Sequence, residues 1–301
     1  LRLAQTTENT NTFEAVAVEW VERNKAKWTP YYLKQVERFL EVDVYPYVGK
    51  LPIRAVSAAH LLEILKRVEK RAPTVALLLR QWCSAIFRYA VSTLRADGDP
   101  SVALKGAITR PKVEHHKPLS RTDIPVFLDA LGSYGGHRAT VIALRLLLLL
   151  FVRTIELRGA AWSEFDLDAA EWRIPAERMK MRDPHIVPLP LQAVELLRKL
   201  YQLTGGRPLL FPNNRRPKTY MTATTLNRAL ERMGYAGRFS SHGFRATAST
   251  ILNEMGYRVD VIERQLAHKE RNTSRASYNR AESVSYTHLR AHETKANLVC
   301  R

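Results

Sequence analysis

The chain has 301 residues, of which 46% are hydrophobic, and a net charge of +18 from 47 Lys and Arg against 29 Asp and Glu. It is long enough for two domains, and it is basic throughout, with 19 basic and 12 acidic residues in 1–117 and 28 and 17 in 118–301. This charge favours a nucleic-acid partner over a merely basic protein. Two cysteines exclude a disulfide framework and favour a reducing compartment. The longest apolar run, 141–152, is too short to cross a membrane.

Residues 12–108 show the apolar spacing of four helices, which predicts a small all-α domain. Thr29 before Pro30, Ser57 and Pro73 are the expected helix starts. Basic residues of this domain are candidates for a DNA-facing side, with a solvated surface charge as the alternative for each. These candidates are Lys25, Lys27, Lys34, Arg38, Arg80 and Arg88.

Residues 109–119 lack periodicity and contain two prolines, so they are expected to link two domains. His115 and His116 lie side by side in this linker, but no other candidate ligand follows at a suitable spacing. We therefore expect an exposed histidine pair, and neither a metal nor a cofactor.

The most apolar helix is predicted over 137–152, and it delivers Arg153 at its end. Glu156 follows three residues later, so its carboxylate can brace the guanidinium. The alternative is an arginine that only balances the helix dipole. Short strands are expected at 172–174 and 185–189, with Lys180 presented by the loop between them.

The segment from Ser240 to Arg280 carries the remaining candidate site residues. Ser240 or Ser241 is expected to cap a helix that begins near His242. His242 and Arg245 would then share a face near the positive end of that helix, which suits a phosphate. The alternative for His242 alone is a cap or a core histidine.

Two further candidates complete the segment. His268 lies just beyond a second short predicted helix, and Tyr278 follows ten residues later. Taken alone, Tyr278 is more simply a half-buried anchor, and Lys180 a solvated loop charge. A tyrosine phenol, with a pKa near 10, is nevertheless a suitable nucleophile for a reversible attack on a phosphodiester, because it is also an adequate leaving group.

In order and spacing, these residues resemble the catalytic set of the tyrosine recombinase, or phage integrase, family. The set is Arg153 with Glu156, Lys180, His242 with Arg245, His268 and Tyr278. Neighbouring segments are similar to those of P4-like integrases, namely Phe151-Val152-Arg153-Thr154, Met179-Lys180, His185-Ile186-Val187-Pro188-Leu189 and Ala276-Ser277-Tyr278-Asn279-Arg280. The resemblance covers residues 12–282.

The resemblance implies a mainly α fold of two domains. An all-α core-binding bundle would occupy 12–108 and, after the linker 109–119, an α-rich catalytic domain with a small β-sheet or hairpin would occupy 120–282. Ile155 stands where such integrases usually have glycine, and it is expected to shift the helix that positions Arg153. We expect the arm-binding domain of P4-like members to be missing from the N-terminal side. Residues 283–301 are atypical for the family and are interpreted as a foreign or frame-shifted tail, in which Tyr286 is a bystander.

The resemblance further implies a site-specific DNA recombinase of a mobile element such as a prophage, which needs no metal or ATP. Tyr278 would form a 3′-phosphotyrosine, Arg153 and Arg245 would hold the phosphate with a histidine, and Lys180 would protonate the leaving oxygen. The implied partners are double-stranded DNA, three further copies in a homotetramer on paired sites, and accessory DNA-bending proteins. The implied location is the bacterial cytoplasm, on the nucleoid when bound. Two alternatives stay open: a type IB topoisomerase-like enzyme, and a DNA-binding protein that has lost catalysis.

Overall fold

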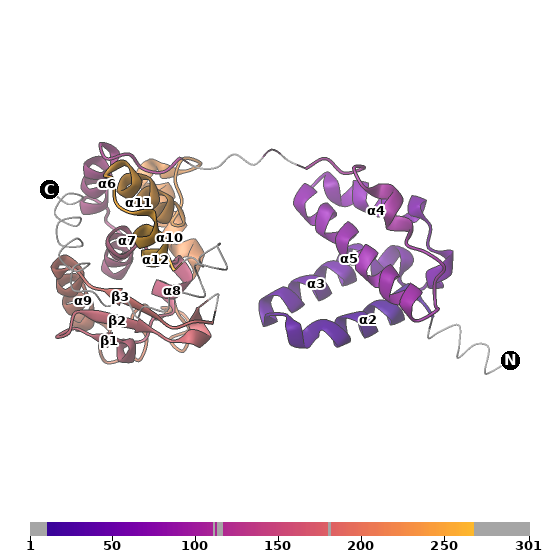
Figure 1. The fold of residues 1–301 in the computed structure, drawn as a ribbon, viewed down its shortest axis with the longest axis horizontal. Coiled ribbons are helices and arrows are strands. Elements are labelled where there is room, and N and C mark those ends of the chain that lie inside the picture. Colours follow the sequence, from indigo (N-terminus) through magenta and orange to yellow (C-terminus); the bar gives the residue numbers. More distant parts are fainter. Residues whose placement is uncertain (1–10, 111, 113–116, 180–181, 268–301) are drawn as a thin grey trace. The chain divides into compact units, whose positions relative to one another are not determined.

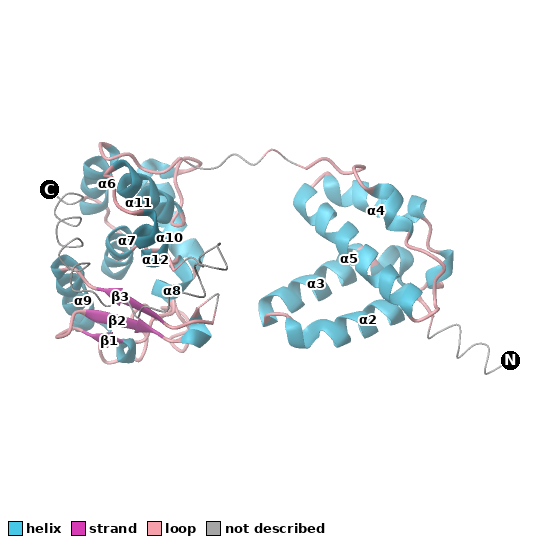
Figure 2. Ribbon diagram, viewed as in Figure 1, coloured by secondary structure: helices cyan, strands magenta, loops and turns pink. Residues whose placement is uncertain are grey.

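The computed structural model describes residues 11–110, 112, 117–179 and 182–267. The chain divides into two compact units, 1–114 and 115–301, and each has a hydrophobic core of its own (Figure 1). Helices dominate both units, and the second also holds one small sheet (Figure 2). The predicted mainly α fold class is therefore confirmed. Within the described ranges, no helix combines the length and the hydropathy that a bilayer crossing requires.

The described residues of the first unit form a bundle of four helices, and the predicted starts of three of them are confirmed. Thr29 Oγ1 accepts the Tyr32 N–H at 3.3 Å ahead of Pro30, and Ser57 forms a reciprocal cap with His60. Proline also opens the last and longest helix. The helices are α2 (Phe13–Asn24), α3 (Pro30–Asp43), α4 (Ala58–Glu69) and α5 (Pro73–Ser92).

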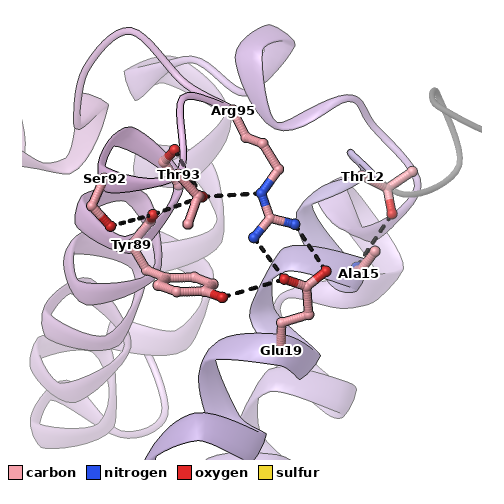
Figure 3. A network of polar contacts seen from close by, with 8 residues as sticks. Thr12, Ala15, Glu19, Tyr89, Ser92, Thr93 and Arg95 are labelled. Atoms are coloured by element: carbon pink, nitrogen blue, oxygen red, sulfur yellow. Dashed lines mark hydrogen bonds and ion pairs between the residues drawn. The ribbon is translucent and has the colours of Figure 1, made fainter.

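A polar network joins α2 to the segment that follows α5 (Figure 3). The guanidinium of Arg95 donates to both carboxylate oxygens of Glu19, at 2.9 and 2.6 Å, and the Tyr89 hydroxyl donates to the same carboxylate at 3.4 Å. These hydrogen bonds, chiefly that from Arg95, hold the pKa of Glu19 below its ordinary value. Arg95 is thus committed to an internal contact and is a poor candidate for binding a phosphate.

The second unit is built around α7 (Arg138–Leu150), in which ten of 13 residues are buried. A helix that is apolar on nearly all sides must be covered on all sides, and other helices of the unit pack around it. Those that contact it most are α8 (Thr154–Arg158), α9 (Leu191–Thr204), α10 (Ala223–Leu230) and α11 (Gly243–Glu254). The unit also contains α6 (Asp123–Gly132) and α12 (Val259–Gln265).

Three short antiparallel strands form the sheet of this unit in the order β1-β2-β3. They are β1 (Phe165–Asp166), β2 (Glu171–Ile174) and β3 (His185–Pro188). The two predicted strands are confirmed as β2 and β3, with Trp172 opposite Val187 and Ile174 opposite His185. The connection between them contains position 180, which lies outside the described residues.

Candidate active site

Arg153 is positioned by a break in the chain rather than by the end of the apolar helix. The helix predicted over 137–152 ends at Leu150, because Phe151 adopts a left-handed conformation with φ 58°. The chain then turns, and Arg153 becomes the residue that precedes α8. The end predicted for this helix, at 152, is therefore wrong, since a left-handed residue cannot continue an α-helix.

Glu156 holds Arg153 through two hydrogen bonds. Its Oε2 accepts the main-chain N–H of Arg153 at 2.7 Å, and its Oε1 accepts Nη1 of the guanidinium at 2.6 Å. The Glu156 side chain is 2% exposed and that of Arg153 is 18% exposed. Ile155, between them, is 45% exposed. Its side chain faces outward and both contacts of Glu156 are made; a shift of α8 relative to integrases with glycine here stays a prediction.

Arg245 reaches the same place from α11. It is buried, and its Nη1 donates to the Phe151 carbonyl at 2.8 Å, while its Nη2 donates to the Leu266 carbonyl. Burial, and next the positive charge of Arg153, lower the pKa of Arg245 to about 10. This value is still well above neutral pH, so two cations meet here beside the buried carboxylate of Glu156, and the charge of Glu263 also acts on Arg245. Two charged guanidiniums in one place suit an anion such as a phosphodiester.

The end of α12 is attached to this arginine pair. Arg153 Nη2 donates to the Ala267 carbonyl at 3.2 Å, next to the Leu266 carbonyl that Arg245 holds. The Gln265 side-chain amide donates to the Leu150 carbonyl at 3.2 Å, which ties α12 to the end of α7. The described chain ends at residue 267. Predicted residues His268 and Tyr278, like Lys180, lie outside the described residues.

His242 precedes α11, and its side chain is exposed. The predicted serine cap is wrong, because no side chain caps α11. The main-chain N–H of Ser241 instead donates to Asn227 Oδ1 at 3.0 Å, and the Ser240 carbonyl accepts the Gly243 N–H at 2.8 Å. Tertiary packing has replaced the local cap. His242 is exposed whereas Arg245 is buried. The contacts of Arg245 therefore give no support to the predicted contact of His242 with the phosphate.

His185 belongs to the site, although its position in a predicted strand concealed it. Burial lowers the pKa of its ring, and the charges of Glu156, Arg153 and Arg245 all act on that pKa. The ring is therefore close to the arginine pair and neutral at pH 7. A histidine at the first position of a strand, directly after a candidate active-site loop, was the available signal.

Arg178 is a second residue that the sequence did not single out. One end of its guanidinium donates to the main-chain carbonyl of Glu156, and the other to the carboxylate of Glu164. Trp172 Nε1 donates to that carboxylate as well, at 2.9 Å. Arg178 thereby ties the start of the β2–β3 connection to α8, and it does so two residues before Lys180.

The candidate DNA-binding residues of the first unit differ in their exposure and in whether their charged groups already have a partner within the protein. Lys27 and Lys34 are exposed, whereas Lys25 forms an ion pair with Glu22. Arg88 Nη1 donates to the Ser84 hydroxyl at 2.8 Å. Arg80, also on α5, is half-buried. Their contact with DNA stays a prediction.

In the part of the chain that the structure describes, no group of three or more His, Cys, Asp or Glu side chains is placed to hold a metal ion. The histidine pair of the linker, 115 and 116, lies outside that part.

Comparison with known proteins relates the whole of this architecture to one family. The model of the phage integrase central domain matches residues 13–107, and that of the phage integrase family matches residues 118–283. The integrase of Enterobacteria phage P4 is 42% identical over 283 residues, covering 89% of this chain and 64% of that protein. Prophage integrase IntZ of Escherichia coli K12 is 39% identical over 270 residues, covering 89% and 66%. The chain thus spans about two thirds of the length of these curated relatives.

Solved structures share the fold at low sequence identity. The Tn1549 transposon integrase in complex with circular intermediate DNA has a TM-score of 0.68 and 16% identity, covering 93% of this chain and 98% of that one. A lambda integrase tetramer bound to a Holliday junction has a TM-score of 0.67 and 17% identity, covering 92% and 80%. With both of its units matched by integrase models and with P4 integrase among its relatives, the chain belongs to the phage integrase family, the tyrosine recombinases.

Proposed function

We propose that this chain is a site-specific DNA recombinase that cuts and rejoins DNA through a 3′-phosphotyrosyl intermediate, for the integration or excision of a mobile element. The observation that carries the proposal is the meeting of Arg153 and Arg245, from distant segments, beside the buried carboxylate of Glu156. The charges of Glu156 and Glu263 both act on Arg245, and the two guanidiniums, which stay charged, can together hold the oxygens of a phosphate. The relatives are integrases, which favours a recombinase over a topoisomerase-like enzyme or an inactive DNA-binding protein.

In the proposed reaction the arginine pair holds the non-bridging oxygens of the scissile phosphate. The Tyr278 oxygen forms a bond to phosphorus and gives its phenolic proton to the surrounding water, and the bond from phosphorus to the 5′ oxygen breaks. Lys180 supplies the proton that the departing 5′ oxygen takes up. His242 and His268 are proposed as further donors to the phosphate. Rejoining is the reverse attack by a 5′-hydroxyl, so the linkage energy is kept and no water is consumed.

The proposed partner is double-stranded DNA, and the proposed working form is a homotetramer on paired sites. The lambda integrase tetramer on a Holliday junction supports this assembly by analogy of fold. Accessory DNA-bending proteins and action on the bacterial nucleoid are further parts of the proposal.

A suicide substrate tests the proposal. A nicked attachment site is incubated with the protein in EDTA, and a covalent protein–DNA complex is sought on a denaturing gel. We expect the wild type and Tyr286→Phe to form the complex and Tyr278→Phe to form none. Arg245→Ala should slow its formation by about 10²–10³-fold, the usual cost of one preorganised donor. Absence of a wild-type complex would leave a DNA-binding protein, and relaxation of supercoils without site preference would indicate a topoisomerase.

A further inference from the structure

The short helix α8 positions two residues of the site, although a helix of its length is not stable by itself. Arg153 precedes α8, and Glu156 lies in its first turn. The helix has five residues, whereas isolated helices shorter than about 12–15 residues are marginal in water. Contacts with other segments must therefore fix α8, and with it the place of the Arg153 guanidinium.

Arg178 makes one of these contacts from the start of the β2–β3 connection. Its Nη2 donates to the main-chain carbonyl of Glu156. In a longer α-helix the Ala160 N–H would donate to that carbonyl, but it donates to the Leu157 carbonyl at 3.2 Å. The last carbonyls of a helix have no partner within it, so Arg178 supplies the partner of this one.

Arg178 is itself fixed at its other end by the sheet. Its Nη1 donates to both carboxylate oxygens of Glu164, and Trp172 Nε1, on β2, donates to the same carboxylate at 2.9 Å. The side chains of Arg178 and Glu164 are 22% and 9% exposed. A Cβ on Gly159 would lie 3.3 Å from Arg178 Nη2, so the guanidinium also lies against the residue that follows α8. Both ends of the Arg178 side chain are thus committed within the protein.

Glu156 connects this anchor to the arginine that would bind phosphate. Its carboxylate accepts from the main-chain N–H and from Nη1 of Arg153, at 2.7 and 2.6 Å, while its carbonyl accepts from Arg178. A second anchor of α8, from Arg158 Nη1 to the Met221 carbonyl at 2.7 Å, does not involve Glu156. Any shift of the Glu156 main chain therefore moves Arg153, and Arg178 is the side chain that opposes this shift.

We propose that Arg178 is a positioning residue for DNA cleavage: it ties the main chain of Glu156 to the sheet through Glu164, and so fixes the place at which Arg153 receives the scissile phosphate. The inference rests on the proposed recombinase function. It assigns to Arg178 an effect on the rate of cleavage and not on the affinity for DNA, because both ends of the guanidinium contact the protein.

The first test compares Arg178→Met with the control Arg173→Met, an exposed arginine of β2. Single-turnover cleavage of the suicide site is measured at saturating DNA, and the dissociation constant is measured separately on the intact duplex site. We expect Arg178→Met to cleave about 10–10²-fold more slowly, since a small misplacement of catalytic groups has an effect of that size. Its dissociation constant should change by less than about twofold, and Arg173→Met should cleave at the wild-type rate. A loss of affinity as large as the loss of rate would overturn the inference.

A second variant guards against a failure to fold. Arg178→Met leaves the Glu164 carboxylate buried without its counterion, which destabilises a protein. The double variant Glu164→Gln/Arg178→Met removes that charge and keeps an oxygen for Trp172 Nε1. It should fold and show the same loss of rate as Arg178→Met, and a rate equal to that of Glu164→Gln alone would overturn the inference.

Two further measurements identify the residue through which Arg178 acts. When Arg153 is already replaced by alanine, adding Arg178→Met should slow cleavage by less than about twofold, because the group to be positioned is absent. Additive losses would overturn the inference. A substrate with sulfur in place of the 5′ oxygen has a leaving group that needs no acid, so it should restore the rate of Lys180→Ala but not that of Arg178→Met. Restoration of Arg178→Met would show that Arg178 serves the acid rather than Arg153.

The last readout does not depend on cleavage. Amide hydrogen exchange of residues 154–160 should be faster in Arg178→Met than in the wild type, and unchanged in Arg173→Met. Wild-type exchange in Arg178→Met would show that Arg178 does not hold α8 and would overturn the inference. A wild type that forms no covalent complex would refute the recombinase proposal alone, because the exchange experiment would still decide whether Arg178 holds α8.

Discussion

Replacing Glu156 by glutamine removes the one buried carboxylate of the site while keeping its size. In the wild type both of its oxygens accept hydrogen bonds from Arg153, at 2.7 Å from the main-chain N–H and at 2.6 Å from Nη1. In Glu156→Gln one acceptor becomes an NH₂ group that faces a donor. The charges of Arg153 and Arg245 then lose their shared counterion.

The cost follows from burial. Removing one partner of a buried ion pair destabilises a protein by about 3–5 kcal/mol. The Glu156 side chain is 2% exposed, but that of Arg153 is 18% exposed and retains some solvation. The lower end of the range, about 3 kcal/mol, therefore applies. For a unit of this size, about 2–4 °C is lost per kcal/mol, which predicts a fall in the melting temperature of about 6–12 °C.

Calorimetry of the whole chain measures this fall in the transition of the second unit. That transition is identified by its lack of response to Glu19→Gln, which weakens only the first unit. Glu195→Gln, an exposed position on α9, is the matched control and should change the unfolding free energy by less than about 0.5 kcal/mol. If Glu156→Gln has the same melting temperature as this control, the Glu156 carboxylate does not stabilise the arginine pair. That result would refute the role of counterion assigned to Glu156.

Three further predictions concern packing, charge and pH. Gly243→Ala should destabilise the second unit by about 1–3 kcal/mol, because a Cβ there would lie 2.6 Å from the buried Phe239 ring, whereas Gly132→Ala, which meets nothing within 4 Å, should be neutral or stabilising. DNA affinity should fall steeply as salt rises, and Lys34→Ala should reduce the slope of log K against log salt by about 0.9. Because burial lowers the pKa of His185 below its ordinary 6.5, the unfolded state binds the proton more readily. The wild type should therefore lose stability relative to His185→Asn as the pH falls from 7 through the lowered pKa.

Each of these predictions has a contrary result. Equal melting temperatures for Gly243→Ala and the wild type would show that the Phe239 ring can move aside without loss of stability. A flat salt response, or a Lys34→Ala slope equal to that of the wild type, would remove Lys34 from the phosphate-contacting surface. A stability difference between wild type and His185→Asn that does not vary from pH 7 to 5 would show that the ring of His185 is not shielded from water in the folded state.

Local signals were enough to predict much of this fold. Thr29 before Pro30, and Ser57 three residues before His60, satisfy free N–H groups of the helices they start, so their effect is decided within one turn of chain. The alternation at 172–174 and 185–189 likewise predicted β2 and β3, because each strand buries one face. The order and spacing of Arg153, Glu156 and the later candidates indicated the family, because order and spacing can be compared without knowledge of the fold.

Tertiary packing decided what those signals left open. Phe151 ends the apolar helix in a left-handed conformation, although the sequence has no glycine at that position. The main-chain N–H of Ser241 donates to Asn227, and its hydroxyl does not cap α11. The hydrogen bonds of Arg153 and Arg245 to the residues that follow α12 join segments far apart in the chain, and their acceptors are main-chain carbonyls. Every residue has such a carbonyl, so no pattern of side chains marks the ones that will be used. Only the folded chain, by bringing the end of one helix against two arginine side chains, selects them.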